Sequence, residues 1–237
     1  MKNILLILLT FTLFACKDKD NDNSIPSSDY ELSPDGLTLV KWKNENTTAV
    51  DMQADPTLGR VQIIGKEAFS EVKNLGSIKL SNNLIKIEEK AFFESKLKSV
   101  IIPKGVQVIG KNAFSLSSLV SVQFSEGLIS IDERAFYSCN IPSLNFPESL
   151  QTIGEFAFFG NETIVSVIIL KNMQNIGFLA FYTCPKLTSV TFKGSTPPKV
   201  KEPFDTIIRV YVPKGKLEMY KNNKDFKDYT DIISEEE

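Results

Sequence analysis

The chain has 237 residues, of which 24% are charged and 42% hydrophobic, and its formal net charge is −2. This composition is typical of an ordered chain with a core, and the lack of a basic surplus argues against a nucleic-acid-binding protein. The sequence contains no histidine, which excludes Ser-His-Asp and Cys-His nucleophilic sites and His-ligated zinc sites.

Residues 1–15 are typical of a bacterial signal peptide. Lys2 supplies a positive charge, and the apolar run 4–14 is too short to span a bilayer. Leu13-Phe14-Ala15-Cys16 resembles a lipobox, which predicts cleavage before Cys16 and acylation of this residue. Several acyl chains on Cys16 would anchor the protein stably in a membrane. An ordinary secretory leader with an incidental cysteine is the alternative.

Residues 16–29 consist of Cys16 and a polar stretch that predicts a flexible tether. The lysine and acidic residues directly after Cys16 resemble the tag that directs some Gram-negative lipoproteins to the outside of the outer membrane. We therefore expect an outer-membrane lipoprotein exposed at the cell surface. A plain solvated spacer is the alternative interpretation of this stretch.

Residues 30–60 are expected to form an N-terminal cap. The run 37–42 alternates in part and predicts a strand, and 48–52 looks like a degenerate repeat strand. Because the end of a solenoid exposes an apolar cross-section, it needs a cap. Trp42, the only tryptophan, is expected to plug this end, with a ligand-stacking platform as the alternative.

A repeated motif that ends in Ala-Phe organises the chain between residues 61 and 193. The six Ala-Phe pairs follow one another at intervals of 23, 22, 22, 22 and 23 residues. Self-similarity at this period predicts a leucine-rich-repeat solenoid. Within its core the phenylalanines should stack as a continuous row: Phe69, Phe92, Phe114, Phe136, Phe158 and Phe181.

A hexamer of the form L-x-x-L-x-L lies between successive Ala-Phe pairs and predicts one strand per repeat. Its positions one, four and six should face the core, whereas positions three and five share the outward face. Position three is always serine: Ser77, Ser99, Ser121, Ser143, Ser166 and Ser189. Position five varies: Lys79, Ile101, Gln123, Asn145, Ile168 and Thr191.

The two outward columns suggest different roles. Small hydroxyls fit a closely packed ladder and can hydrogen-bond along it, which gives the serine column a structural explanation. The variable column is the better binding candidate, because specificity can be placed where a fixed scaffold varies.

Cys139 and Cys184 occupy the same register two repeats apart. Strands stack at about 4.8 Å, so equivalent atoms two repeats apart are separated by roughly 10 Å. A disulfide needs Cα atoms closer than about 7 Å. The sequence therefore predicts two buried free thiols and no bridge.

The chain is expected to end in an imperfect seventh unit and a cap. Phe204 continues the spacing of the phenylalanines, and the run 209–213 supplies a strand, so the solenoid should extend over residues 61–213. Residues 214–237 suggest a short amphipathic helix over the last repeat, followed by a frayed acidic tail from Ser234.

The repeat consensus, L-x-S-V-x-[IF]-P-x-x-V-x-x-I-G-x-x-A-F, resembles the BspA-like leucine-rich repeats of bacterial surface proteins over residues 60–213. The period and this resemblance together predict a β-rich right-handed solenoid. It should have six to seven repeats of 22–23 residues, a parallel sheet on one face, short helical turns on the other, and caps at both ends.

The resemblance implies a non-catalytic binding or adhesion module, since BspA-like proteins are associated with attachment to host proteins, host cells or other bacteria. The expected partner is a host or bacterial surface protein or glycan, with a lipid anchor in the membrane, no nucleic acid, no cofactor and no metal. The expected binding face comprises Lys79, Ser99, Ile101, Ser121, Gln123, Ser143, Asn145, Ser166, Ile168, Ser189 and Thr191.

Two other functions remain open. The chain could be a structural or accessory subunit of an envelope complex, such as one that captures polysaccharide. An enzyme would need a carboxylate pair in a pocket, whereas Glu88, Glu89, Asp132 and Glu133 are expected to be solvated charges beside the Ala-Phe turns.

Overall fold

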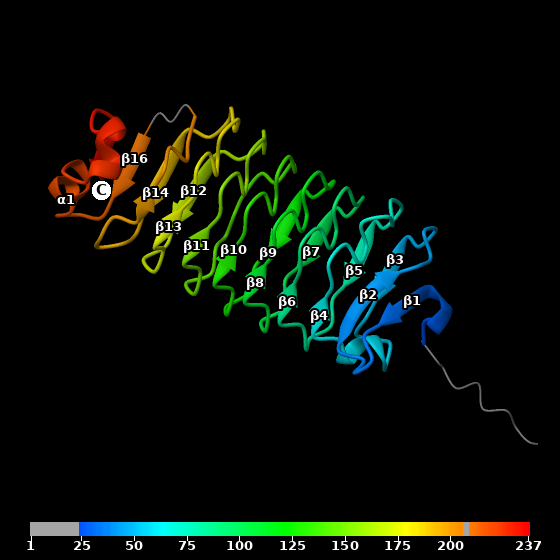
Figure 1. Cartoon of the computed structure of the whole chain (residues 1–237). Coiled ribbons are helices and arrows are strands. Elements are labelled where there is room, and N and C mark those ends of the chain that lie inside the picture. Colours follow the sequence, from blue (N-terminus) through cyan, green and yellow to red (C-terminus); the bar gives the residue numbers. More distant parts are fainter. Residues whose placement is uncertain (1–23, 206–208) are drawn as a thin grey trace, which may run out of the picture.

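The computed structural model describes residues 24–205 and 209–237. Successive turns of the chain stack along one axis into an elongated β-solenoid, with the α1 region at one end and β1 at the other (Figure 1). The predicted class of fold is therefore confirmed. Most turns place short strands on two opposite sides of a shared core.

One side carries a continuous nine-stranded sheet, here called the Ile sheet, in the order β1-β2-β4-β6-β8-β10-β11-β13-β15. β1 is antiparallel to β2, and all other pairs are parallel in one register, so that Ile109, Ile131 and Ile153 lie side by side. The strands are β1 (Tyr30–Leu32), β2 (Thr38–Trp42), β4 (Ile63–Ile64), β6 (Lys86–Ile87), β8 (Val108–Ile109), β10 (Ser130–Ile131), β11 (Thr152–Ile153), β13 (Asn175–Ile176) and β15 (Lys199–Val200).

The Ile sheet corrects the expectation of a sheet on one side only. Short apolar runs that lie before each Ala-Phe turn, for which the sequence predicted no strand, form the longest sheet. The pairing arises because a constant repeat length brings each two-residue run beside its equivalent in the next turn.

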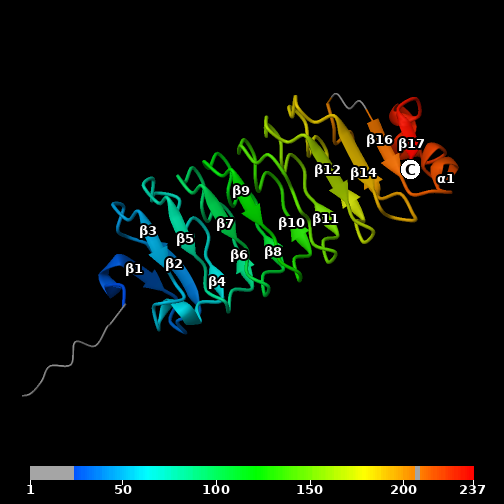
Figure 2. The same ribbon diagram turned by 180° about the vertical axis from the view of Figure 1, so that it is seen from behind.

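The opposite side carries the hexamer strands. They are β3 (Ala49–Asp51), β5 (Ser77–Lys79), β7 (Ser99–Ile101), β9 (Ser121–Gln123), β12 (Ser166–Ile169), β14 (Ser189–Phe192), β16 (Arg209–Val212) and β17 (Ile233–Glu235). Their ladder is interrupted, because the strands pair only within β3-β5, β7-β9 and β12-β14-β16-β17. Leu144 contributes a single bridge to Val167. Figure 2 shows β9 and β12 as separate arrows on this side.

The Ala-Phe segments form tight turns and no regular helix. The residue before each alanine has a positive φ of 53–57°, as at Asn112 and Arg134. The backbone N–H of each phenylalanine bonds to the neighbouring turn instead of to its own, and Phe114 N donates to Ala135 O at 2.8 Å. This third ladder acts together with hydrogen bonds inside each turn, such as Ala113 N to Gly110 O at 3.1 Å, and the backbone needs no α-helical bonds there.

The predicted row of phenylalanines is confirmed. Neighbouring rings from Phe69 to Phe181 have centroids 5.0–5.3 Å apart and planes within 11° of parallel. Phe204 extends the row at 5.7 Å. Trp42 extends it at the other end, stacked between Tyr30 and Phe69, and is only 2% exposed. The tryptophan therefore acts as the expected plug.

The N-terminal cap starts earlier than the sequence predicts. Ile25 packs against the core, and its N–H donates to Asp55 Oδ2 at 2.6 Å. Residues 27–29 form the 3-10 helix η1 (Ser27–Asp29), and η2 (Leu58–Arg60) follows later in the cap. Residues 24–29 thus belong to the folded cap, and the rest of the expected tether lies outside the described residues.

The C-terminal cap contains the predicted helix, α1 (Leu217–Lys221), followed by the 3-10 helix η3 (Lys224–Tyr229). Tyr220 is fully buried and donates its hydroxyl hydrogen to Gly194 O at 2.9 Å. Burial raises the pKa of Tyr220 to about 12. The α1 helix is thereby fixed over the last turns of the solenoid.

The acidic tail is not frayed as expected. Ile233 is buried, and β17 pairs in parallel with β16. Glu235 accepts a hydrogen bond from Gly215 N at 2.7 Å, and Glu236 forms an ion pair with Lys193 at 2.5 Å. The tail is ordered because it closes the edge of the sheet and each of these two glutamates has a partner.

Both internal cysteines are buried and free, as predicted. Cys139 lies 3.3 Å from Ser117 Oγ, and its thiol donates to Phe114 O. Burial raises the pKa of each thiol to about 11. The expected signal peptide and Cys16 lie outside the described residues, and within the described part no helix is long and apolar enough to cross a membrane.

Candidate functional site: the serine face

The outward side of the hexamer strands is here called the serine face; it comprises hexamer positions three and five. All the expected binding residues lie on it. Most are exposed, whereas Ser189 and Thr191 are half-buried. In the paired regions the register aligns equivalent residues, so Ser99 lies beside Ser121 and Ser166 beside Ser189. The structure therefore brings the predicted residues into two parallel columns.

The serines do not form the side-chain ladder that would explain their repetition. Among the described residues, no side-chain hydrogen bond is made by the hydroxyls of this column, Ser77, Ser99, Ser121, Ser143, Ser166 and Ser189. These hydroxyls remain available to solvent or to a ligand. Their small size also leaves the neighbouring column accessible.

The variable column begins with an ion pair. Lys79 Nζ lies 2.7 Å from Asp51 Oδ2, and the hydrogen bond from Lys79 lowers the pKa of Asp51. Ile101 and Ile168 are 62% and 47% exposed. Between them, Gln123 and Asn145 present exposed carboxamides.

The central part of the serine face carries no charge. From Ser99 to Thr191, positions three and five hold only hydroxyl, amide and aliphatic side chains. Charged side chains flank this part: the Asp51–Lys79 pair lies on one side, and Arg209 lies on the other. Such a surface favours neutral ligands, because it offers a strongly charged group no partner.

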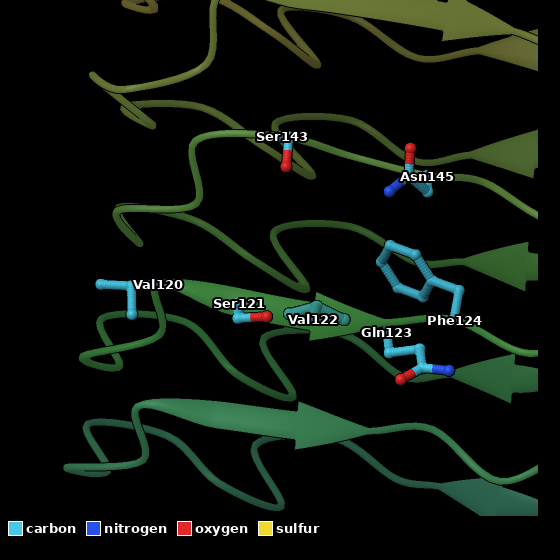
Figure 3. A pocket seen from close by; sticks show the side chains of 7 residues that line it. All are labelled: Val120, Ser121, Val122, Gln123, Phe124, Ser143 and Asn145. Carbon is cyan, nitrogen blue, oxygen red and sulfur yellow. The ribbon is translucent and has the colours of Figure 1, made fainter.

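A hollow of about 460 Å³ opens in the middle of the uncharged part. Figure 3 shows Gln123 and Asn145 near one end, beside the ring of Phe124, with Ser121 and Ser143 further along the same strands. The remaining lining residues are Val120 and Val122. The hollow coincides with the interruption of the ladder between β9 and the segment 143–146.

A second hollow, of about 240 Å³, lies at the other interruption, between β5 and β7. Ile78, Leu80, Ile101 and Pro103 make much of its lining. Gln53 closes one side by donating to Leu80 O at 2.9 Å. This hollow is more apolar than the first and suits an aliphatic group.

Two sets of exposed residues were missed from the sequence. Val120 and Val165, at hexamer position two, are about half exposed at 48% and 52%. On the Ala-Phe edge, Tyr137, Phe159 and Tyr182 stack in a half-buried row with centroids 5.1 and 6.1 Å apart. The signal was present, because an aromatic residue follows Ala-Phe in several repeats. The faces of these rings cover one another, so the row offers little free ring surface.

Three of the four carboxylates predicted to be solvated charges beside the Ala-Phe turns form ion pairs, and the fourth, Asp132, accepts a hydrogen bond from Ser130 Oγ at 3.1 Å. Glu88 and Glu89 contact Lys86 and Lys66, both at 3.0 Å. Lys111 donates to Glu133 at 2.8 Å, and this hydrogen bond lowers the pKa of that carboxyl. A carboxyl group whose pKa is lowered, or that is paired with a lysine, is a poor general acid near neutral pH.

No cluster of three or more potential metal ligands occurs among residues 24–205 and 209–237.

The repeats match the model of the BspA type leucine rich repeat region, with six copies over residues 56–158 and 129–202. These ranges together cover more than half of the chain. The chain belongs to this family. No curated protein matches the sequence.

Several solved structures resemble this chain at low identity. The leucine-rich repeat protein of T. pallidum is 18% identical, over 88% of this chain and 94% of that one, with a TM-score of 0.42. A leucine-rich cell surface protein of Faecalibacterium prausnitzii is 16% identical, over 88% and 93%, also with a TM-score of 0.42. The pneumococcal vaccine antigen PcpA is 18% identical, with a TM-score of 0.37; the match covers 79% of this chain but only 65% of PcpA.

Proposed function

We propose that the protein is a lipid-anchored cell-surface leucine-rich repeat protein that acts as a non-catalytic binding or adhesion module. The observation that carries the proposal is the serine face, a long accessible surface whose central part is uncharged and varies at one column. Variation on a constant scaffold can adapt a repeat protein to its ligand. The paired carboxylates support the absence of a catalytic role.

The proposed partner is a protein or glycan on a host or bacterial surface. Acylation of Cys16 would attach the solenoid to the outer membrane. A net charge of −2 argues against nucleic acid as a partner. Many copies on one cell would increase the overall strength of attachment.

Protease treatment of intact cells tests the proposed location. Loss of the protein while a periplasmic marker survives is expected, and acylation of Cys16 should be detectable by metabolic labelling with a fatty-acid analogue. Survival of the protein until lysis would contradict surface display. It would favour the accessory-subunit function, which co-purification with a fixed envelope partner would then support.

A variant of the serine face tests the binding role. Cells displaying Lys79→Ala/Gln123→Ala/Asn145→Ala should attach less to host cells and immobilised matrix proteins than cells displaying the wild type. The matched control is Lys104→Ala/Gln107→Ala/Gln174→Ala, which removes one lysine and two carboxamides outside this face. Equal attachment by both variants, at equal surface abundance, would remove the serine face as the contact surface.

A further inference from the structure

The break between β9 and the segment 143–146 has a local cause in the sequence. Where the ladder is intact, the residue at hexamer position two donates to the preceding turn: Val120 N to Lys98 O at 2.9 Å and Thr188 N to Val165 O at 3.0 Å. The equivalent residue in the broken turn is Pro142. Because proline has no N–H, it cannot donate this bond to Val120 O.

Bulky side chains behind the break add to the effect of Pro142. Phe124 and Phe146 occupy hexamer position six in consecutive repeats, where Ile102 and Ile169 stand in others. Their rings contact each other at 5.7 Å with an angle of 32° between planes. Within the described residues, no backbone hydrogen bond joins 121–124 to 143–146.

Unpaired backbone groups therefore face the hollow from both walls. Ser121 N and Gln123 O bond toward β7, to Lys98 O at 3.2 Å and from Ile102 N at 2.8 Å. Since backbone groups alternate along a strand, Val122 directs its N–H and C=O toward the hollow. On the opposite wall Leu144 bridges to Val167 in the next turn, so Ser143 and Asn145 direct theirs back toward β9.

The lining selects a neutral ligand that both donates and accepts hydrogen bonds. Unpaired N–H and C=O groups stand beside two hydroxyls and two carboxamides, and no lining residue is charged. An apolar ligand would leave these groups without partners, which is costly. A charged ligand would find no opposite charge. A sugar hydroxyl satisfies both requirements because it is donor and acceptor at once.

The width of the break excludes an inserted peptide strand. A strand paired with both walls would need them about 9.5 Å apart, twice the strand spacing. Behind the hollow, however, the rings of Phe124 and Phe146 still touch, and β10 and β11 remain paired on the Ile sheet. Individual hydroxyl groups can reach into a gap of this kind, whereas a whole backbone cannot.

We propose that the hollow between β9 and the segment 143–146 binds a sugar residue of a neutral oligosaccharide, with Gln123 and Asn145 as its main side-chain contacts. This inference rests on the proposed binding function and names its ligand class. The sugar lies over the hollow, and its hydroxyls bond to Val122, Ser143 and the two carboxamides.

A glycan array tests the ligand class. The purified full-length protein in detergent is probed with neutral glucose-, galactose-, mannose- and N-acetylhexosamine-terminated oligosaccharides and with sialylated and sulfated versions of the same chains. Binding to at least one neutral series is expected, and titration calorimetry then gives its affinity. Binding to charged glycans alone would overturn the proposal.

Two variants test the site. Gln123→Ala/Asn145→Ala should weaken binding of the neutral glycan about tenfold or more, as expected when two hydrogen-bonding side chains are lost. The control, Gln107→Ala/Gln174→Ala, removes two carboxamides outside the serine face and should bind as the wild type does. Equal affinities for the two variants would place the sugar elsewhere.

A third variant, Pro142→Thr/Phe146→Ile, tests whether the glycan needs the hollow itself or only the exposed side chains of the serine face. It restores an N–H donor and an aliphatic core residue while keeping every residue that lines the hollow. Closure of the ladder should appear as stronger hydrogen-exchange protection of the amides of Val122, Ser143 and Asn145, together with loss of glycan binding. Protection without loss of binding would overturn the proposal. If protection is unchanged, binding should be unchanged as well, and its loss would contradict the hollow as the cause.

Failure of the glycan proposal differs from failure of the proposed function. A protein that still mediates attachment of cells to immobilised matrix proteins but binds no neutral glycan retains the adhesion role and loses this ligand. A protein that mediates neither kind of binding loses both.

Discussion

The two sides of the solenoid are built from the same repeats but differ in continuity. The Ile sheet pairs without interruption from β1 to β15, whereas the serine face is divided into three groups of strands. The Ile sheet is uniform because, from β4 to β15, each turn repeats an extended residue followed by Ile or Val in one register. Behind the serine face, hexamer position six is aliphatic in some repeats and phenylalanine in others, and one turn carries Pro142 at position two.

This difference means that one side of the solenoid maintains the fold while the other side can vary. The Ile sheet, the Ala-Phe turns and the stacked rings fix the spacing of the repeats. The serine face can then lose backbone hydrogen bonds at β5–β7 and at β9 without loss of the fold. Substitutions on the two sides should therefore have unequal effects.

The largest expected effect comes from the row of rings. Phe136→Ala should lower the free energy of unfolding by about 3–5 kcal/mol, because Phe136 is fully buried and stacked between Phe114 and Phe158 at 5.2 and 5.3 Å. In a nearest-neighbour array, the loss of a central contact can also uncouple the two halves. Urea denaturation followed by circular dichroism measures both effects, the second as a separate transition.

Phe204→Ala is the matched control for the row. Phe204 lies at its end and has one neighbour in the row, Phe181 at 5.7 Å, although Tyr229 also touches it. Its loss should affect the last turn more than the whole solenoid. An unfolding midpoint for Phe136→Ala equal to that of the wild type would refute the row as the main source of cohesion.

The sequence predicted the features whose residue pattern recurs in every repeat. The row of phenylalanines and the outward columns follow from six aligned copies. The Ile sheet was missed because a two-residue strand such as Val108–Ile109 gives no periodic signal of its own. The ordered tail was missed because Glu236 pairs with Lys193, which lies 43 residues away in the sequence.

The hollow could not be predicted, although Pro142 is visible in the sequence. A missing N–H matters only in relation to the carbonyl it would have met, here Val120 O, and that relation depends on the register of two turns. The sequence correctly predicted that hexamer positions three and five face outward in two columns. Their role in binding stays a prediction that the variants described above address.

The next largest effect concerns the interior at alkaline pH. The pKa of Cys139 and of Cys184 rises from 9.0 to about 11 because burial disfavours the thiolate. The unfolded chain releases these protons near pH 9, whereas the folded chain retains them until about pH 11. The contribution of the protonated thiols to the free energy of unfolding is therefore fully present below pH 9. It falls as the pH rises from 9 to 11, by at most about 1.4 kcal/mol per pH unit for each thiol.

Cys139→Ala/Cys184→Ala isolates this contribution. Chemical denaturation at pH 8, 9 and 10 should give a shallower decline for the variant than for the wild type. Tyr220 and Tyr229, whose burial raises their pKa to about 12, add a similar decline only above pH 10 in both proteins. Parallel declines between pH 8 and 10 would show that the thiols are not shielded as the structure places them.

The smallest expected effect lies on the serine face, at the Asp51–Lys79 pair. The hydrogen bond from Lys79 lowers the pKa of Asp51 below 3.8, so the pair stabilises the fold above that value and the stabilisation is lost as the pH falls through the lower folded pKa. Both side chains are exposed, at 69% for Lys79 and 37% for Asp51, and exposed pairs contribute less than about 1 kcal/mol. Lys79→Met should therefore change the midpoint of urea denaturation at pH 7 only slightly. A loss of unfolding free energy as large as that of Phe136→Ala would mean that the serine face contributes as much to stability as the row of rings does. The proposed difference between the two sides would then be wrong.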